Sequence, residues 1–381
     1  MDTEGGESMM RQILIIVMML FALSPISGCG YTTIENMTLT LVIGIDLDDD
    51  GNLVFGISSP VFSKEAKDKE EEFEVRATTL RHSREGFDKR ALGLTTAGKT
   101  QIVIIGKKLA KQKDWSILLD PFYRDPKSTA TARVVYYDGS IDEIMRYTPK
   151  DKPRLPLYLS NLVETGLFRN ETTKTTIQEF HRQLKDDGIT PSITALRKEQ
   201  ELLLVGTALL DKASRVKMLV DSDEGKLIYI LRKKTRGEFP FTLHLPNAPG
   251  QAIDKVDTKR ISVNLHSIKT TTQARYERDR FIFDVNVHST ATISERLFPF
   301  NVMESPEELE KMIEENLEQK FSKMIRKLQK AKIDPVGFGM YARAYTYPQW
   351  KKVKENWLDN FQKSRVNIKV KVKIIGMGSV K

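Results

Sequence analysis

The only cysteine of the chain, Cys29, follows an apolar run and two small residues. The apolar run extends from Ile13 to Leu23, and Ser27 and Gly28 come directly before the cysteine. A chain with one cysteine cannot close an internal disulfide, so hydrophobic cores have to hold its fold. Its composition, 40% hydrophobic and 29% charged residues, is that of an ordinary globular protein of sufficient length for two or three domains.

The stretch 23–29 resembles a bacterial lipobox, where a diacylglyceryl group is attached to the cysteine sulfur and the preceding peptide is removed. The apolar run is too short to span a bilayer and has the length of a signal-peptide core. We therefore predict that residues 1–28 are a cleaved lipoprotein signal peptide. Cys29 is then the lipidation site, carrying S-diacylglycerol with an N-acyl group as an option. The alternatives are an uncleaved N-terminal anchor, or a free thiol at an ordinary signal-peptidase site.

The first residues are acidic, whereas a signal peptide begins with a basic segment. Asp2, Glu4 and Glu7 precede a second possible start at Met9 or Met10. A chain begun there would open on Met-Met-Arg-Gln or Met-Arg-Gln, which suits a signal peptide better. We predict that translation begins at Met9 or Met10.

The chain is basic, with a formal net charge of +9 that becomes about +11 without residues 1–28. A basic exported protein is attracted to anionic lipid headgroups. Nucleic-acid binding is the rival interpretation of basic charge, but export and the lack of a nucleic-acid motif argue against it. No segment after the signal region has eighteen consecutive apolar residues, so none is predicted to span a membrane.

An acidic turn joins two predicted strands, Thr38–Asp46 and Leu53–Ser58. Its Asp-Gly pair is a hairpin signal. The turn also matches the front of a calcium loop at Asp46, Asp48, Asp50 and Gly51. A calcium loop needs a glutamate at its twelfth position, and Ile57 stands there instead. We predict a hairpin and no metal site.

The segment 93–100 matches the Walker A pattern letter for letter. In a phosphate-binding loop a strand precedes this pattern and a helix follows it, so that the helix N-terminus faces the phosphates. Here a helix is predicted before it, from His82 to Leu94, and a buried strand after it, at 101–106. Nucleotide binding is therefore not predicted.

The rest of the N-terminal region reads as alternating helices and strands. Further strands are predicted at 73–77, 132–137 and 191–196, and helices at 107–119, 155–168 and 176–184. After 198, strands are predicted at 202–210, 217–220 and 241–245, with a short apolar segment at 227–231.

Two strands of alternating pattern, around 261–265 and 281–291, are predicted to pair as a long hairpin. The longest helix begins at Pro306, where Ser305 and Glu308 form a capping box, and continues to about residue 331. A second amphipathic helix carries Trp350, Val353, Trp357 and Phe361. A strictly alternating strand, 365–374, ends the chain with one buried face.

The other face of that last strand is a basic row: Arg365, Asn367, Lys369, Lys371 and Lys373. The first interpretation is that the row provides solubility and protects a sheet edge. The second is contact with lipid headgroups. His266 and His288 lie on the polar sides of their strands, and we expect them to be solvated rather than metal ligands. We predict no catalytic residues, no cofactor and no metal.

The fold class expected is α+β and multi-domain, with mixed or antiparallel sheets and packed helices. We place an N-terminal α+β region at 29–198, with an open alternative of two subdomains divided near 140–155. A C-terminal α+β domain follows at 199–381 and contains the long helix 306–331.

Three blocks of the chain resemble the Ger(x)C lipoproteins, the C subunits of spore germinant receptors. The first is the lipobox cysteine with Ile34-Glu35 and the segment 42–46; the second is the segment 204–210. The third runs from Phe338-Gly339 through the segment 347–350, Trp357 and Phe361 to the last strand. The chain departs from many relatives after the cysteine, where it has Gly30-Tyr31 in place of Trp-Asp.

The resemblance implies a non-enzymatic lipoprotein on the outer face of the spore inner membrane. It implies as partners a multi-spanning A subunit and a transporter-like B subunit that binds the germinant. A second hypothesis is a free-standing exported ligand-binding lipoprotein of a transport system, with a deep cleft between its domains. A third, an envelope enzyme, lacks a Gly-x-Ser-x-Gly elbow, a zinc-binding histidine pair and a free thiol.

Overall fold

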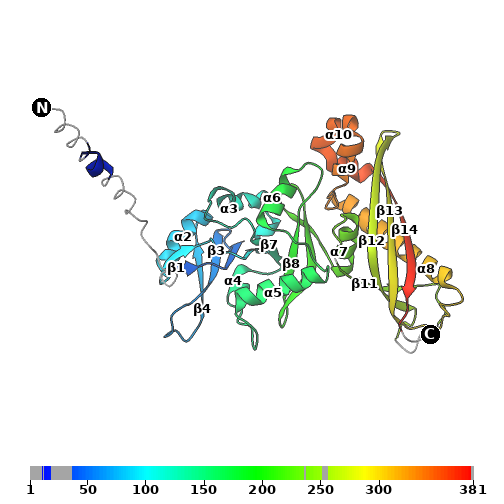
Figure 1. Ribbon diagram of the computed structural model, residues 1–381, viewed down its shortest axis with the longest axis horizontal. Helices are drawn as coiled ribbons and strands as arrows, with labels where there is room; N and C mark the ends of the chain where they lie inside the picture. The colour runs from blue at the N-terminus through cyan, green and yellow to red at the C-terminus, as the bar shows by residue number, and fades with distance from the viewer. Residues whose placement is uncertain (1–10, 12, 19–36, 236, 251–255, 379–381) are drawn as a thin grey trace.

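A computed structural model describes residues 11, 13–18, 37–235, 237–250 and 256–378. Residues 13–18 are helical and exposed, and they stand apart from the folded body (Figure 1). Met9, Met10 and Cys29 lie outside the described residues, so the start site and the lipidation site stay predictions. Within the described residues, every helix is too short or too polar to cross a bilayer.

The described chain forms three sheets with packed helices, which confirms the α+β class. The strands of the N-terminal part are β1 Met37–Leu39, β2 Val42–Leu47, β3 Leu53–Pro60, β4 Glu70–Arg76, β5 Leu94–Thr96, β6 Ile102–Ile105, β7 Arg133–Tyr137, β8 Ser192–Lys198, β9 Leu202–Leu210 and β10 Val216–Val220. Its helices are α2 Leu80–Asp88, α3 Asp120–Arg124, α4 Ile141–Met145, α5 Leu155–Phe168, α6 Ile177–Lys185 and α7 Ser222–Leu231, with 3₁₀ turns η3 Leu109–Lys111 and η4 Trp115–Leu119.

The C-terminal part has four strands in one sheet: β11 Phe239–His244, β12 Arg260–Glu277, β13 Arg280–Arg296 and β14 Arg365–Gly376. Its helical elements are α8 Pro306–Ala331, α9 Phe338–Tyr345, α10 Tyr347–Val353, η5 Lys354–Asn356 and α11 Trp357–Lys363. The long hairpin predicted from the two alternating segments is confirmed as β12 and β13, which pair antiparallel.

The large sheet has the strand order β10-β9-β8-β7-β6-β2-β3-β4. Its four central strands, β2, β6, β7 and β8, are parallel, and the outer strands pair antiparallel. Helices α4 and α5 cover one face, while α2, α6 and the 3₁₀ turns cover the other. Because both faces are covered, apolar residues dominate the central strands, and all four residues of β6 are apolar and fully buried.

The large sheet continues across residue 198, where we placed the domain boundary. Strand β8 pairs antiparallel with β9, so 202–220 belong to the same sheet as the strands before them. Residues from β9 and β10 also join α7 in the core of the C-terminal part. The two parts therefore share strands and core, and the boundary stays a prediction.

Several predicted helices are shorter or broken in the structure. The helix predicted at 107–119 is wrong: η3 and η4 occupy it, separated at Asp114, whose φ of 58° is left-handed. Trp115 is thereby buried and stacks on Phe180 with ring centroids 5.3 Å apart. The helix predicted through Trp350 and Phe361 is interrupted by η5. The apolar segment 227–231 is the end of α7, and the helix expected at 82–94 ends at Asp88.

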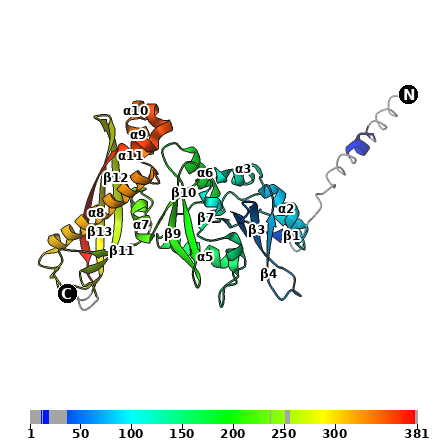
Figure 2. The ribbon, with the colours of Figure 1, turned by 180° about the vertical axis from the view of Figure 1, so that it is seen from behind.

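The last strand, β14, is an edge strand that a helix protects (Figure 2). Three glutamates of α8 accept hydrogen bonds from its open backbone amides: Glu318 from Val370 at 2.9 Å, Glu314 from Val372 at 3.0 Å and Glu310 from Ile374 at 2.8 Å. Four residues of helix rise about 6 Å, and two residues of strand about 6.6 Å, so the helix and strand repeats match over the two steps between these three pairs.

The same glutamates pair with the basic row. Lys371 lies 3.0 Å from Glu314, and Lys373 lies 3.3 Å from Glu310. These two lysines therefore belong to the protected edge, as the first interpretation of the row expects. At Lys371 and Lys373 the basic row pairs with helix α8 and is not a free basic surface.

We predict that Glu314→Ala loosens this edge. The amide of Val372 loses its acceptor, which costs on the order of 1–2 kcal/mol and speeds its hydrogen exchange about tenfold. The matched control is Glu315→Ala, because Glu315 is exposed on the next position of the same helix. Hydrogen exchange read at single amides tests this, and equal exchange of Val372 in both variants would contradict it.

Candidate functional site

The large sheet and the four-stranded sheet of the C-terminal part meet where the loop after α6 touches the loop between α8 and α9 (Figure 1). Thr190 and Asp334 join these loops by two hydrogen bonds. The Thr190 amide donates to the Asp334 carbonyl at 2.9 Å, and the Asp334 amide donates to Thr190 Oγ1 at 3.0 Å. One backbone bond and one bond to a side-chain hydroxyl thus join segments 144 residues apart.

The carboxylate of Asp334 is fully buried and accepts four N–H hydrogen bonds. Its Oδ1 accepts from the amides of Gly337 at 2.8 Å and Phe338 at 3.0 Å. Its Oδ2 accepts from the amide of Gly339 and from the indole of Trp357, both at 2.9 Å. Burial raises the pKa of Asp334, and these donors act against that rise. The carboxylate thus orders the start of α9 and fixes Trp357.

Trp357 lies at the centre of an aromatic cluster that connects α9, α11 and β13. Its ring centroid lies 5.3 Å from that of Phe281 and 6.2 Å from that of Phe283, both in edge-to-face geometry. Phe338 and Phe361 stack at 5.5 Å in the same cluster. Such pairs stabilise beyond the area they bury, so the Asp334 carboxylate is tied to the C-terminal core.

Two glycines allow the backbones at this junction to touch. A Cβ on Gly339 would lie 2.6 Å from the Cα of Gly188, and a Cβ on Gly188 would lie 2.7 Å from the amide nitrogen of Met340. Side chains are excluded at both positions because the obstacle is backbone. Beside this contact Arg343 forms a bidentate ion pair with Asp186, at 3.1 and 3.2 Å.

A half-buried lysine, Lys212, closes the same loop from the other side. The Lys212 ammonium donates to the carbonyls of Gln183 at 2.9 Å, of Leu184 at 3.1 Å and of Asp186. Burial lowers the pKa of Lys212 to about 8. It lies on a cavity of about 630 Å³ between the two parts, whose far wall includes Lys332 and Trp357.

We predict that Asp334→Asn destabilises the protein by on the order of 3 kcal/mol, since an amide has one acceptor oxygen where four donors converge. The control is Asp359→Asn, whose carboxylate makes an exposed pair with Lys332 and should matter little. Urea unfolding of both variants measures the difference. If the two variants had equal urea midpoints and slopes, the four hydrogen bonds to Asp334 would make no net contribution to the free energy of unfolding.

A pH dependence follows from Lys212. Its pKa is about 8 in the folded chain and near its ordinary value in the unfolded chain. Between those values the unfolded chain binds more protons, so this group makes stability rise as pH increases. We expect the difference in free energy of unfolding, natural protein minus Lys212→Met, to become more positive from pH 7.5 to 9.5. A constant difference over this range would contradict the expectation.

The residues of the calcium-like turn serve the hairpin of β2 and β3, which is confirmed. Asp48 accepts from the amides of Asp50 at 3.0 Å and Asn52 at 2.8 Å and pairs with Arg76 at 2.7 Å. Asp46 is buried, and its Oδ1 accepts from the Leu109 amide at 2.9 Å. Across the described residues, no group of histidine, cysteine or acidic side chains has a metal-binding arrangement.

The Walker-like segment forms β5, which pairs with β1, and then turns into β6. A strand therefore follows the pattern, as expected, and no helix N-terminus is presented at its end. The Thr100 hydroxyl donates to the carbonyl of Thr40 at 3.0 Å instead of facing a ligand. His266 lies 3.0 Å from the Thr292 hydroxyl on the polar face of β12, and His288 is exposed.

Sequence reasoning missed the roles of Gly188, Lys212 and Asp334. In the sequence, Gly188 and Asp334 simply follow the helices predicted at 176–184 and 306–331. The available signal was the segment Phe338-Gly339 with Trp357, which the resemblance singled out and which proves to surround the Asp334 carboxylate. Nothing local in the sequence pairs that segment with residues 186–190.

Comparisons with known proteins agree over nearly the whole chain. Residues 30–198 match the model of the spore germination protein N-terminal domain, and residues 205–378 match the model described as spore germination B3/GerAC like, C-terminal. The chain is 24% identical to spore germination protein KC of Bacillus subtilis (strain 168) over 92% of its own length and 91% of that protein. It is 22% identical to spore germination protein GerQC of Bacillus cereus over 97% and 99%.

A solved structure shares the fold. The crystal structure of the GerBC protein superposes with a TM-score of 0.55 at 15% sequence identity, covering 87% of this chain and 96% of GerBC. At that identity the likeness supports the fold alone. The two family models, which together span both sheets and all of the junction, show that the chain belongs to the GerAC-like family of spore germination proteins, the Ger(x)C family.

Proposed function

We propose that the protein is the lipid-anchored C subunit of a spore nutrient-germinant receptor and has no catalytic role of its own. It would lie on the outer face of the spore inner membrane and work with a multi-spanning A subunit and a transporter-like B subunit. The observation that carries the proposal is the match of both family models over residues 30–198 and 205–378.

The chemistry of the junction supports a non-enzymatic role. The ionisable groups there are engaged in bonds that hold loops together: the buried Asp334 accepts four N–H bonds, and the half-buried Lys212 donates to three carbonyls. A catalytic acid or base has to face a site where substrate can bind. Groups engaged in this way suit a body that holds its shape while neighbouring subunits act.

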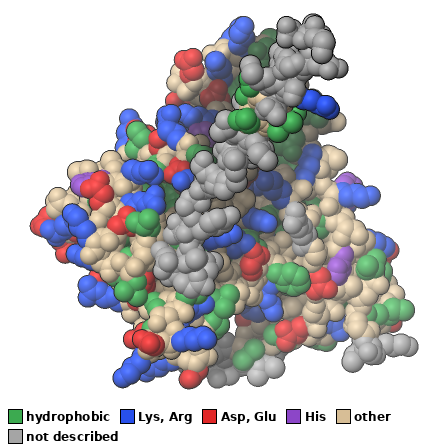
Figure 3. All heavy atoms as spheres, turned by 60° about the vertical axis from the view of Figure 1, so that its left-hand side comes forward, with side chains coloured by type: hydrophobic (Ala, Val, Ile, Leu, Met, Phe, Trp, Pro, Cys, Tyr) green, Lys and Arg blue, Asp and Glu red, His purple; other side chains and the backbone are tan. Residues whose placement is uncertain are grey.

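The position of Cys29 supports an anchor close to the N-terminal sheet. Strand β1 begins at Met37, eight residues after Cys29, and eight residues reach at most about 28 Å. The large sheet would therefore stay next to the bilayer surface. On the face in Figure 3, lysine and arginine side chains are spread widely with acidic side chains between them, which suits attraction to anionic headgroups without one dominant patch.

We predict that Cys29→Ala releases the protein from membranes and makes spores unresponsive to their nutrient germinant. The thiol is the attachment point for the acyl chains, and within the described residues no helix could replace them as a span. Ser27→Ala is the matched control, because it keeps a small residue before the cysteine. Membrane fractionation and germination assays read the outcome. Normal membrane recovery and normal germination with Cys29→Ala would refute the proposal.

The interdomain cavity of about 630 Å³ favours one second candidate, a free-standing ligand-binding lipoprotein. Such proteins close two domains around a ligand by hinge motion. Here the backbone contact of Gly188 with Gly339 and the paired bonds of Thr190 with Asp334 hold the two parts together beside the cavity. Genes for a permease and an ATPase next to this one would favour the second candidate, and genes for two membrane subunits would favour the first.

A further inference from the structure

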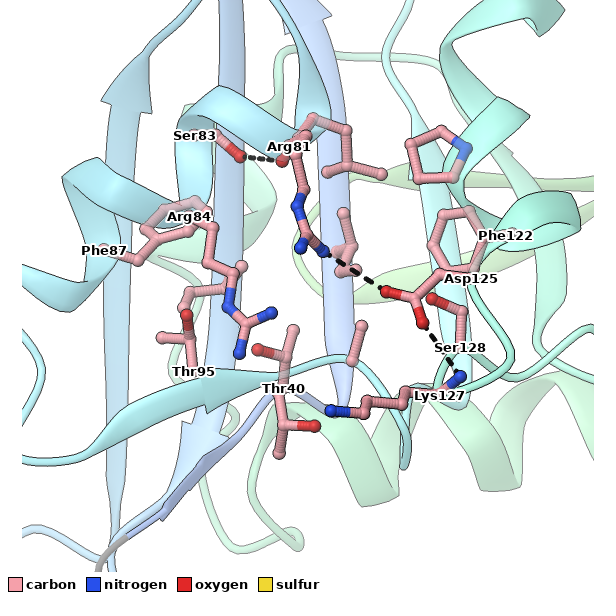
Figure 4. A pocket seen from close by; sticks show the side chains of 16 residues that line it. Thr40, Arg81, Ser83, Arg84, Phe87, Thr95, Phe122, Asp125, Lys127 and Ser128 are labelled. Atoms are coloured by element: carbon pink, nitrogen blue, oxygen red, sulfur yellow. Dashed lines mark hydrogen bonds and ion pairs between the residues drawn. The ribbon is translucent and has the colours of Figure 1, made fainter.

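A second cavity lies in the N-terminal part, between α2, β5 and α3 (Figure 4). It has a volume of about 90 Å³. Its floor is apolar and comes from the large sheet and the two helices: Ile43, Ile57, Leu80, Phe87 and Phe122. A void of this kind, apolar inside and open to solvent at one side, is the usual form of a small-ligand site.

The mouth of this cavity carries an excess of positive charge. Its lining includes three cations, Arg81, Arg84 and Lys127, and one carboxylate, Asp125. Asp125 is already engaged, because it pairs with Arg81 at 3.2 Å and accepts from the Lys127 amide at 2.9 Å. Arg84 reaches only the edge of ion-pair distance, 4.0 Å from Asp88. Figure 4 shows the head groups of Arg84 and Lys127 turned toward the centre of the mouth.

We propose that this cavity binds a compact amphiphilic anion, with its apolar part on the floor and its carboxylate or phosphate between Arg84 and Lys127. An arginine fork and a lysine ammonium are the side chains that best hold such an oxyanion. The volume holds on the order of six water-sized spheres, which admits one ring or a short acyl chain and excludes a long one.

The Walker-like segment contributes to this cavity in a way that its pattern does not predict. Thr95, Thr96 and Ala97 line the wall as part of β5 and the turn after it. The Thr95 amide and hydroxyl are both bound to Asp88, at 2.8 and 2.6 Å, so they are not free to bind phosphate. Recognition therefore falls to the cationic side chains and the apolar floor, not to a phosphate-binding loop.

The anion is a soluble acid or phosphate ester with a short chain or one ring, because the cavity is too small for the acyl chains of a phospholipid. The cavity borders Thr40, one residue after the end of β1, and β1 is the first strand of the described body. A cavity at this end of the chain would face a bilayer if Cys29 anchors the protein. The cavity is present whether or not Cys29 is lipidated. A failed ligand-binding test therefore does not count against the proposed germination role, and a failed germination test does not count against the cavity.

The test uses the full chain in phosphatidylcholine nanodiscs with labelled isoleucine methyl groups. Hexanoate should produce saturable shifts at Ile43 and Ile57, and leave Ile193, a core residue outside the lining, unchanged. Hexylamine, with the same apolar chain and the opposite charge, should bind at least tenfold more weakly. No saturable shift, equal binding of hexylamine, or equal binding of inorganic phosphate would overturn the proposal.

Variants of the lining residues locate the site, and a change of lipid tests its size limit. The double variant Arg84→Gln with Lys127→Gln should weaken hexanoate binding at least tenfold, and Ala97→Phe should block binding by filling the cavity. The matched control is Lys99→Gln, because Lys99 lies outside the lining. Full hexanoate affinity in the first two variants would refute the site. Adding phosphatidylglycerol to the nanodiscs should leave the Ile43 signal and the hexanoate titration unchanged. A saturable shift of Ile43 by this lipid, with loss of hexanoate binding, would contradict the size limit of the site.

Discussion

One buried carboxylate, that of Asp334, holds the junction on which the arrangement of the two sheets depends. Four N–H groups satisfy it, three from the start of α9 and one from Trp357, while its own backbone bonds to Thr190 across the junction. A buried charge is tolerable only when its hydrogen-bonding capacity is filled. The arrangement therefore makes the position of α9, the orientation of the indole and the contact between the two parts interdependent.

The periodic elements could be predicted because a local alternation or repeat of apolar residues is enough to define them. The alternation at 261–265 and 281–291 leads directly to the β12–β13 hairpin, and Pro306 marks the first turn of α8. The predicted capping box is wrong, because the Ser305 side chain makes no capping hydrogen bond. The stretch 107–119 failed because burial of Trp115 against Phe180, a contact across 65 residues, outweighs local helix propensity there. The strand at 202–210 was predicted with its observed bounds, but its pairing with β8 was not, because nothing local in the sequence shows which strand it joins.

The candidate sites were hidden from the sequence for a related reason. Nothing in the sequence shows that Gly188 and Gly339 touch, or that the Lys212 ammonium lies among backbone carbonyls. The cationic mouth of the N-terminal cavity draws Arg84 from α2 and Lys127 from the segment after α3. Only the motif-like patterns, the calcium-like turn and the Walker-like segment, could be weighed in advance, because the required order of elements around them is known.

The protected edge of β14 has a consequence for crowding. Proteins tethered to one membrane meet in two dimensions at high local density, where open strand edges readily pair with one another and start aggregates. Along β14 the glutamates of α8 already occupy the outward amides of Val370, Val372 and Ile374. Copies of this chain that lie side by side on a membrane therefore cannot pair through these three amides and extend the sheet between molecules.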